Sequence, residues 1–209
     1  MTVTYIRDPA AIYARSFEII AREAKLAHLP ISAQAIAARV IHACGMLDVA
    51  QDLVISEQFA TVCKTTLDLG KPILVDAEMV RHGIIARQLV RNNQIICTLN
   101  DPRARGIGIK NAFTRSAAAV ELWRDELAGA VAVIGNAPTA LFRLLELIDA
   151  GAAKPACIVG MPVGFVGAAE SKAELIANSR GIPFAAIRGR RGGSAMASSV
   201  INAVTGDQP

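Results

Sequence analysis

The chain has 209 residues, a mass of 22.0 kDa, a formal net charge of +4 and a pI near 9.1; 53% of its residues are hydrophobic, 19% charged and 4% aromatic. This size suits one α/β domain, and we expect a single domain over residues 1–209 because no linker rich in proline, serine or charge divides the sequence. The low charge content and the few aromatic residues argue against nucleic acid as a partner. An anionic small molecule suits the excess of basic residues better.

The mean hydropathy of +0.38 raises the question of a membrane. The longest runs without charge, such as "LAGAVAVIGNAPTAL", are interrupted by glycine, asparagine and proline and are too short to span a bilayer. No membrane partner is therefore predicted. The first twenty residues lack a basic segment followed by an apolar run and a cleavage site, so the expected location is the cytoplasm.

Three helices are predicted in the first third of the chain. The first begins with Asp8 as N-cap and Pro9 at the first helical position. The second runs from Ser32 to Gly45, and the third from Ser56 to Gly70.

From residue 72 onward, short apolar runs alternate with helical stretches. The runs are "PILVD", "QIICTL", "AVAVIG", "ACIVGMPV" and "PFAAIRG", and the main helical stretches span 114–129, 137–151, 168–181 and 193–204. The runs are apolar at successive positions, which is typical of strands that helices cover on both faces. The sequence thus predicts an α/β fold: a three-layer α/β/α domain with a mainly parallel sheet of roughly five strands.

Glycines follow three of these strands, in "VIGNAPTAL", "GMPVGFVGAAE" and "IRGRRGGSAM". In parallel sheets, ligands bind beyond the carboxyl ends of the strands, so a ligand-binding rim is expected there, with Arg188, Arg190 and Arg191 to receive carboxylates or phosphates. Each junction taken alone is equally well explained as a simple turn. "GIGIKN" and "LDLGKP" do not complete a nucleotide-binding motif.

The four cysteines (Cys44, Cys63, Cys97, Cys157) are scattered, without a Cys-x-x-Cys pair or a histidine at zinc spacing. They are interpreted as small hydrophobic side chains, and no metal site is predicted.

The three histidines differ in their surroundings. His42 precedes the glycine that ends the second helix, where it could simply interact with the last carbonyl groups. Arg39 lies three residues earlier on the same helical face and can reach a substrate carboxylate if His42 faces the substrate; the alternative is a solvated arginine. His82 follows the first predicted strand and is a candidate substrate contact, whereas His28 is expected at the surface or in a loop.

Several segments together resemble the precorrin-8X methylmutases of corrin biosynthesis. They are "IRDPAAIYARSFEII", "VIHACGM", "PILVDAEMV", "AFTRSAAA", "VIGNAPTALF", "GMPVGFVGAAESK" and "IRGRRGGSAM", in that order from about Ile6 to Asn202. The resemblance implies a homodimeric α/β isomerase without cofactor. It implies a shift of the methyl group on C-11 of the macrocycle to C-12, which yields hydrogenobyrinate.

The resemblance also implies roles for individual residues. His42, in "VIHACG", matches the proton donor and acceptor of the family. Its imidazole can give and recover a proton at neutral pH because its unperturbed pKa lies near ~6.5. The segments that hold Ser16, Arg115 and Asn136 match family stretches near the substrate, although Ser16 can bond its own backbone and the other two can act as first-turn or capping residues. The glycines of "DPRARGIGIKN" depart from the family pattern.

Other interpretations remain open at this stage. The substrate can be metal-free or can carry cobalt. A noncatalytic corrin-binding carrier would use the same pocket, and an unrelated phosphate- or flavin-binding α/β enzyme is a further alternative, which the missing nucleotide motifs disfavour.

Overall fold

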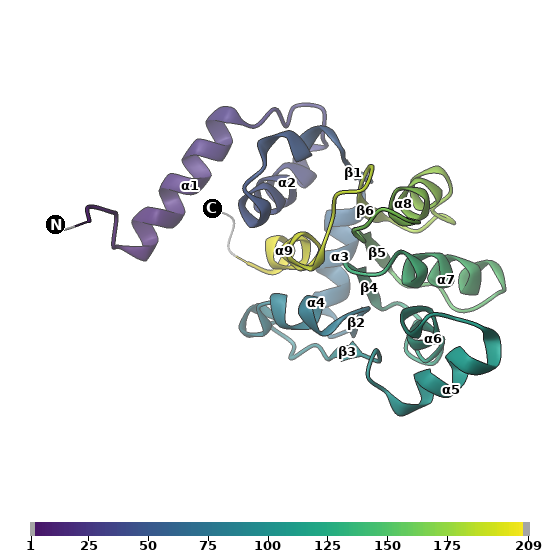
Figure 1. Cartoon of the computed structure of the whole chain (residues 1–209). Coiled ribbons are helices and arrows are strands. Elements are labelled where there is room, and N and C mark those ends of the chain that lie inside the picture. Colours follow the sequence, from purple (N-terminus) through teal and green to yellow (C-terminus); the bar gives the residue numbers. More distant parts are fainter. Residues whose placement is uncertain (1–2, 207–209) are drawn as a thin grey trace.

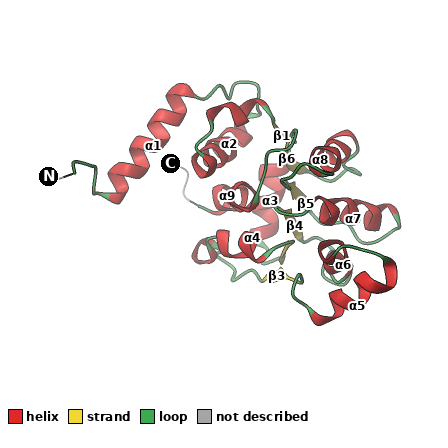
Figure 2. Ribbon diagram, in the orientation of Figure 1, coloured by secondary structure: helices red, strands yellow, loops and turns green. Residues whose placement is uncertain are grey.

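The computed structural model describes residues 3–206. A mixed sheet lies at its centre (Figures 1 and 2). Its strands, in the spatial order β1-β6-β5-β4-β2-β3, are β1 (Leu53–Ile55), β6 (Phe184–Ile187), β5 (Cys157–Gly160), β4 (Val131–Ile134), β2 (Ile73–Val75) and β3 (Ile95–Cys97). All neighbouring pairs are parallel except β1 and β6.

Helices cover both faces of the sheet. On one face lie α2 (Ile31–Cys44), α3 (Phe59–Asp68), α4 (Glu78–Gly83) and α9 (Ser194–Thr205). On the other lie α6 (Arg115–Glu121), α7 (Pro138–Asp149) and α8 (Ala168–Ala177), with α5 (Pro102–Asn111) packed outside α6. Short 3₁₀ helices, η1 (Leu47–Gln51) and η2 (Ala86–Gln88), complete the connections.

Successive residues of a strand serve the two faces of the sheet. In β4, Val131 and Val133 belong to the core under α2 and α9, while Ala132 and Ile134 belong to the core under α7. The strand is apolar throughout because both of its faces are buried. The predicted three-layer α/β/α fold with a mainly parallel sheet is confirmed.

The sheet formed by residues 3–206 has six strands, one more than the roughly five that the sequence predicts. The additional strand, β1, pairs antiparallel with β6 at the edge of the sheet. Ser56, predicted to open the third helix, instead continues this pairing, since its hydroxyl accepts from the Phe184 N–H at 2.8 Å. The helix begins three residues later, at Phe59.

Other helix boundaries also differ from the predictions. The second helix begins at Ile31 rather than Ser32, and it ends as predicted, with Gly45 at φ +69°. The helix predicted over 114–129 ends at Glu121. The chain turns there because Trp123 and Leu127 are both buried and the indole N–H of Trp123 donates to the Thr98 hydroxyl at 3.0 Å. Helices α4 and α5 were not predicted.

Helix α1 (Pro9–Glu23) extends away from the body and contacts it mainly through α2 (Figure 1). As predicted, Asp8 caps it: the carboxylate accepts from the Ala11 N–H at 2.9 Å, and Pro9 occupies the first turn. Only Phe17 and Ile20 of this helix are buried. Among the described residues, no helix is long and apolar enough to cross a bilayer.

Candidate active site

Four side chains meet where α1 crosses α2; we name Tyr13, Phe17, Arg39 and His42 the His42 cluster. The imidazole of His42 stacks on the Phe17 ring with centroids 5.0 Å apart, and the Tyr13 ring approaches it edge-on at 5.9 Å. Tyr13 and Phe17 are one helical turn apart, so they present adjacent rings to α2. The two aromatic rings thereby fix one face of an imidazole that otherwise remains exposed.

Arg39 completes the His42 cluster. Its guanidinium carbon lies 5.5 Å from the Tyr13 ring centroid, and the guanidinium donates to the Tyr13 hydroxyl. Partial burial lowers the pKa of His42 below its ordinary value of 6.5, and the positive charge of Arg39 lowers it further. The free protein therefore holds His42 as the neutral imidazole at neutral pH. Arg39 is only half-buried.

The C-terminus of α2 carries His42 to the carboxyl edge of the sheet. After Gly45 the chain passes through η1 into β1, whose first residue, Leu53, pairs with Ile187 at the carboxyl end of β6. The Arg188 N–H donates to the Asp52 carbonyl at 2.8 Å. His42 thus lies on the side of the molecule where ligands of parallel sheets bind.

The loops at this edge are joined to one another. The buried carboxylate of Asp76, after β2, accepts from the N–H groups of Gly135, Asn136 and Ala137, after β4, at 2.9, 3.0 and 2.7 Å. Burial raises the pKa of Asp76, and these N–H donors act in the opposite direction. Because α4 and α7 leave β2 and β4 toward opposite faces of the sheet, Asp76 spans a topological switch point. Asn136 is half-buried there.

Two further loops extend the rim toward η1. Gly167 lies against Pro138, and a Cβ on Gly167 would be 3.3 Å from the Cβ of the proline. Gly192 lies so close to the backbone of Met161 and Pro162 that a Cβ would be 2.6 Å from the Pro162 carbonyl oxygen. The 161–167 loop exposes large apolar side chains, with Phe165 83% and Val166 89% exposed.

The predicted rim arginines divide into two groups. Arg188 and Arg190 are exposed, and the guanidinium of Arg190 lies 5.4 Å from the Phe165 ring centroid. Arg191 is instead engaged within the protein, in ion pairs with Asp48 at 2.6 Å and Asp52 at 2.5 Å. A cationic rim therefore adjoins exposed apolar side chains at this edge.

Arg115 is the first residue of α6 and lines, together with Arg105, a cavity of about 870 Å³ formed by α5 and the segments on either side of it. The neighbouring Thr114 hydroxyl bonds that of Thr139, at the start of α7, at 2.8 Å. This contact connects the cavity to the loop that carries Asn136. The "DPRARGIGIKN" segment that forms one wall is the helix α5.

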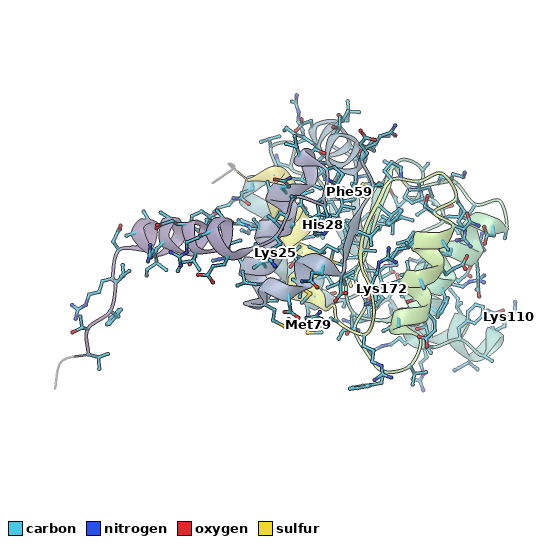
Figure 3. The ribbon with its side chains drawn as sticks, turned by 90° about the horizontal axis from the view of Figure 1, so that it is seen from above. Lys25, His28, Phe59, Met79, Lys110 and Lys172 are labelled. Atoms are coloured by element: carbon cyan, nitrogen blue, oxygen red, sulfur yellow. The ribbon has the colours of Figure 1, made fainter. Side chains whose placement is uncertain are left out.

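The remaining candidates are placed as follows. Ser16 is half-buried on α1 beside Phe17. His82, on α4, has an 80% exposed side chain that lies 3.9 Å from Glu78 and is outside the His42 cluster. His28 lies exposed in a turn, as predicted, with Nε2 2.9 Å from the Ala50 carbonyl (Figure 3).

Cys63 and Cys157 are buried free thiols and Cys44 and Cys97 are half-buried. Within residues 3–206, His, Cys, Asp and Glu side chains form no group that could hold a metal ion.

The sequence did not single out Tyr13 or Asp76. The spacing of Tyr13 and Phe17 in "IYARSF" was a signal for a shared helical face, but only the contact with α2 gives that face its place beside His42. Asp76 ends a strand, a position typical of functional carboxylates, yet its partners lie about 60 residues away.

The fold and the site define an α/β protein whose carboxyl edge carries an imidazole and guanidinium groups beside exposed apolar side chains, a surface that suits an anionic ligand with apolar parts. The precorrin-8X methylmutase family model matches residues 11–206. The chain belongs to this family and is an isomerase of cobalamin biosynthesis.

Individual relatives agree. The precorrin-8X methylmutase of Pseudomonas aeruginosa is 53% identical over 202 residues, which cover 97% of each chain. That of a Sinorhizobium species is 52% identical and covers 96% of this chain and 95% of its own. A cobalt-precorrin-8 methylmutase of Salmonella typhimurium is 38% identical and covers 96% of both. The solved precorrin-8X methylmutase of Thermus thermophilus superposes with a TM-score of 0.85 at 32% identity and covers 94% of each chain.

Proposed function

We propose that this isomerase moves the methyl group on C-11 of precorrin-8X to C-12, giving hydrogenobyrinate, and that His42 is the proton donor and acceptor. The observation that carries the proposal is the position of His42: a partly exposed imidazole, held on one face by Phe17, at the carboxyl edge of the sheet. The names of the relatives at 52–53% identity support precorrin-8X as the substrate.

The chemistry is a 1,5-sigmatropic shift, in which the carbon–methyl bond at C-11 breaks as the bond at C-12 forms, with no net change of oxidation state. Protonation of a ring nitrogen draws electron density from the migration terminus and lowers the barrier, and loss of that proton afterwards returns the imidazole to its starting form. The carboxylates of the bound substrate raise the pKa of His42 and so oppose the effect of Arg39. Binding thereby charges the imidazole where the proton is needed.

We propose that Ser16, Arg39, His82, Arg115 and Asn136 contact the substrate. Arg39 lies closest to His42, and its half-buried guanidinium can receive a carboxylate while it rests on the aromatic rings. Asn136 belongs to the loops that Asp76 joins, and Arg115 follows Thr114, whose hydroxyl bonds that of Thr139 near the same loop. His82 lies outside the His42 cluster, and its partner among the described ion pairs is Glu78.

The proposed substrate is metal-free. The relatives named precorrin-8X methylmutase are 52–53% identical to this chain, whereas the Salmonella enzyme named for the cobalt form is 38% identical. We further propose one methylmutase domain that acts as a homodimer in the cytoplasm. Support for the dimer comes from the protruding α1 and the segment before it, in which Tyr5, Ile6 and Ile12 are 65, 52 and 45% exposed. Exposed apolar side chains gathered in one region are typical of protein–protein interfaces.

Isotope labelling tests the direction of the shift. Precorrin-8X with a ¹³C-labelled methyl group on C-11 is incubated with the protein, and the product is examined by carbon NMR. The proposal predicts that the label is found on the quaternary C-12. A product that retains the label on C-11, or tight binding without turnover as expected of a corrin carrier, contradicts it. A parallel incubation with cobalt-precorrin-8 contradicts the metal-free assignment if that substrate turns over faster.

A further inference from the structure

Lys172, labelled in Figure 3, lies on α8, and its side chain is fully buried. Lysine is almost never fully buried unless its ammonium group has a partner, because removal of the charge from water is costly. Burial lowers the pKa of Lys172 to about 8, and the carboxylate of Asp52 acts in the opposite direction. The ammonium form therefore predominates at neutral pH inside the protein.

The partner of Lys172 is a backbone carbonyl group. Its Nζ donates to the carbonyl oxygen of Arg191, in the segment between β6 and α9. The guanidinium of the same arginine is held by Asp48, in the first turn of η1, and by Asp52, which follows its last residue. Arg191 is thus anchored at both ends, by α8 through its backbone and by η1 through its side chain.

This double anchor fixes the 188–193 loop. The Gly193 N–H donates to the Met161 carbonyl at 2.8 Å, and the Gly164 N–H donates to the Arg190 carbonyl at 3.3 Å, so the 161–167 loop is held with it. Arg188 and Arg190 are exposed, and the Arg190 guanidinium lies over the Phe165 ring. η1 begins five residues after His42. Burial raises the pKa of the Cys44 thiol, and the positive charge of Arg191 offsets part of this rise. The loop therefore lies beside the C-terminal end of α2, the helix that carries His42.

We propose that Lys172 is a positioning residue for the methyl shift: its ammonium group holds the 188–193 loop in the shape that presents Arg188 and Arg190 to the substrate carboxylates beside His42. The inference rests on the proposed function, since it assigns the carboxylates of that substrate to these two arginines. Lys172 itself does not touch the substrate.

The energetics separate this role from a purely structural one. Lys172→Met removes the desolvation penalty of the buried ammonium group, but it also leaves the Arg191 carbonyl without this donor. The two effects oppose each other, so the variant is expected to fold with a melting temperature close to that of the parent protein. What it loses is the bond that fixes the Arg191 carbonyl.

Lys154 provides a matched control. Its Nζ also donates to an arginine carbonyl, that of Arg180, at 2.7 Å, but the side chain of Lys154 is exposed. Lys154 lies near the amino ends of the strands, where its carbonyl accepts from the Gly129 N–H. Lys154→Met removes the same kind of bond away from the rim. It is expected to leave both kcat and KM unchanged.

The experiment measures kcat and KM for precorrin-8X, together with hydrogen–deuterium exchange of residues 188–193 without substrate. Lys172→Met is expected to raise KM about 10-fold, to change kcat less than about threefold, and to speed exchange of the loop about 10-fold or more, as loss of one charge-assisted hydrogen bond allows. Unchanged KM and unchanged exchange overturn the proposal. A parent protein that does not turn over precorrin-8X contradicts the proposed function instead, whatever the exchange shows.

A second variant covers the case in which Lys172→Met does not fold. Asp48 is 67% exposed and holds the same loop through the guanidinium of Arg191. Asp48→Asn is expected to raise KM in the same direction by about threefold, since Asp52 still pairs with Arg191. An unchanged KM in Asp48→Asn, with the loop exchanging as in the parent protein, counts against the proposal.

Discussion

The imidazole of His42 stacks on the phenyl ring of Phe17, with ring planes 24° apart and centroids separated by 5.0 Å. The two residues come from different helices, so the orientation of the candidate proton donor depends on the packing of α1 against α2. An imidazole free to rotate would present its nitrogens to the substrate only part of the time.

Removal of the Phe17 ring is therefore expected to impair the reaction more than binding. Phe17→Leu keeps an apolar side chain in this nearly buried position but no longer supports the imidazole face. We expect kcat to fall about 10-fold with little change in KM, because misorientation of a catalytic group by a fraction of an ångström slows chemistry steeply. Steady-state kinetics and a thermal melt check this. A variant with normal kcat shows that the stacking is dispensable.

Arg39 lowers the pKa of His42 by its positive charge, as the second cause after burial. Arg39→Met is expected to raise that pKa in the free enzyme, since the imidazolium form loses a neighbouring like charge. The proposed role of His42 as the acid requires its protonated form, so kcat/KM of the parent enzyme should fall as the pH rises through a pKa below 6.5, and this fall should occur at higher pH in Arg39→Met. NMR titration of His42 checks the shift. Arg39→Lys keeps the charge and should keep the lowered pKa; an equal rise in both variants contradicts the electrostatic explanation.

Asp76 joins the loops after β2 and β4 through three N–H donors. Asp76→Asn places amide hydrogens against these donors and leaves at least one of them without an acceptor inside the protein. We expect the free energy of unfolding to fall by about 3 kcal/mol. Urea denaturation measures it. Asp68→Asn, at an exposed i,i+4 pair with Lys64, is the control and should change stability by less than about 0.5 kcal/mol. Equal effects of the two substitutions rule out the special role of Asp76.

Ile12 tests the proposed dimer. It lies on the protruding α1 and is 45% exposed. A glutamate there would bring an unpaired charge into an apolar interface, so Ile12→Glu is expected to weaken association by at least about 100-fold. Light scattering coupled to gel filtration reads the mass directly. A parent protein that elutes as a monomer at micromolar concentration contradicts the dimer itself.

Much of the fold was predictable because its strands are buried on both faces. Runs such as "AVAVIG" and "ACIVGMPV" read as parallel strands, and the helices between them carry clear apolar periodicity. β1 escaped prediction because three residues at a sheet edge leave almost no pattern, and because its pairing partner, β6, lies about 130 residues later. Helix α5 escaped because Gly106 and Gly108 disfavour helix; the Asp101 cap, Pro102 and packing on α6 stabilise it instead.

The candidate site was predictable only in part. The segment "VIHACG" pointed to His42, and the helical spacing correctly placed Arg39 beside it. The roles of Tyr13, Asp76 and Lys172 depend on contacts between distant segments. Lys172 in particular has the sequence context of an ordinary surface residue in a short amphipathic helix, yet its ammonium group is buried.

The most direct test of the account is the visible absorption spectrum of precorrin-8X incubated with the parent protein and, separately, with His42→Ala. We expect the corrin chromophore to form with the parent protein and to form at least ~100-fold more slowly with His42→Ala, the usual effect of removing a general acid. Because the imidazole of His42 is partly exposed and, within residues 3–206, makes no hydrogen bond on which the packing of α2 depends, the variant should keep its fold and still bind the product. Formation of the chromophore at the same rate with both proteins would remove His42 from the mechanism, and no change of the spectrum with either would contradict the proposed reaction on the metal-free substrate.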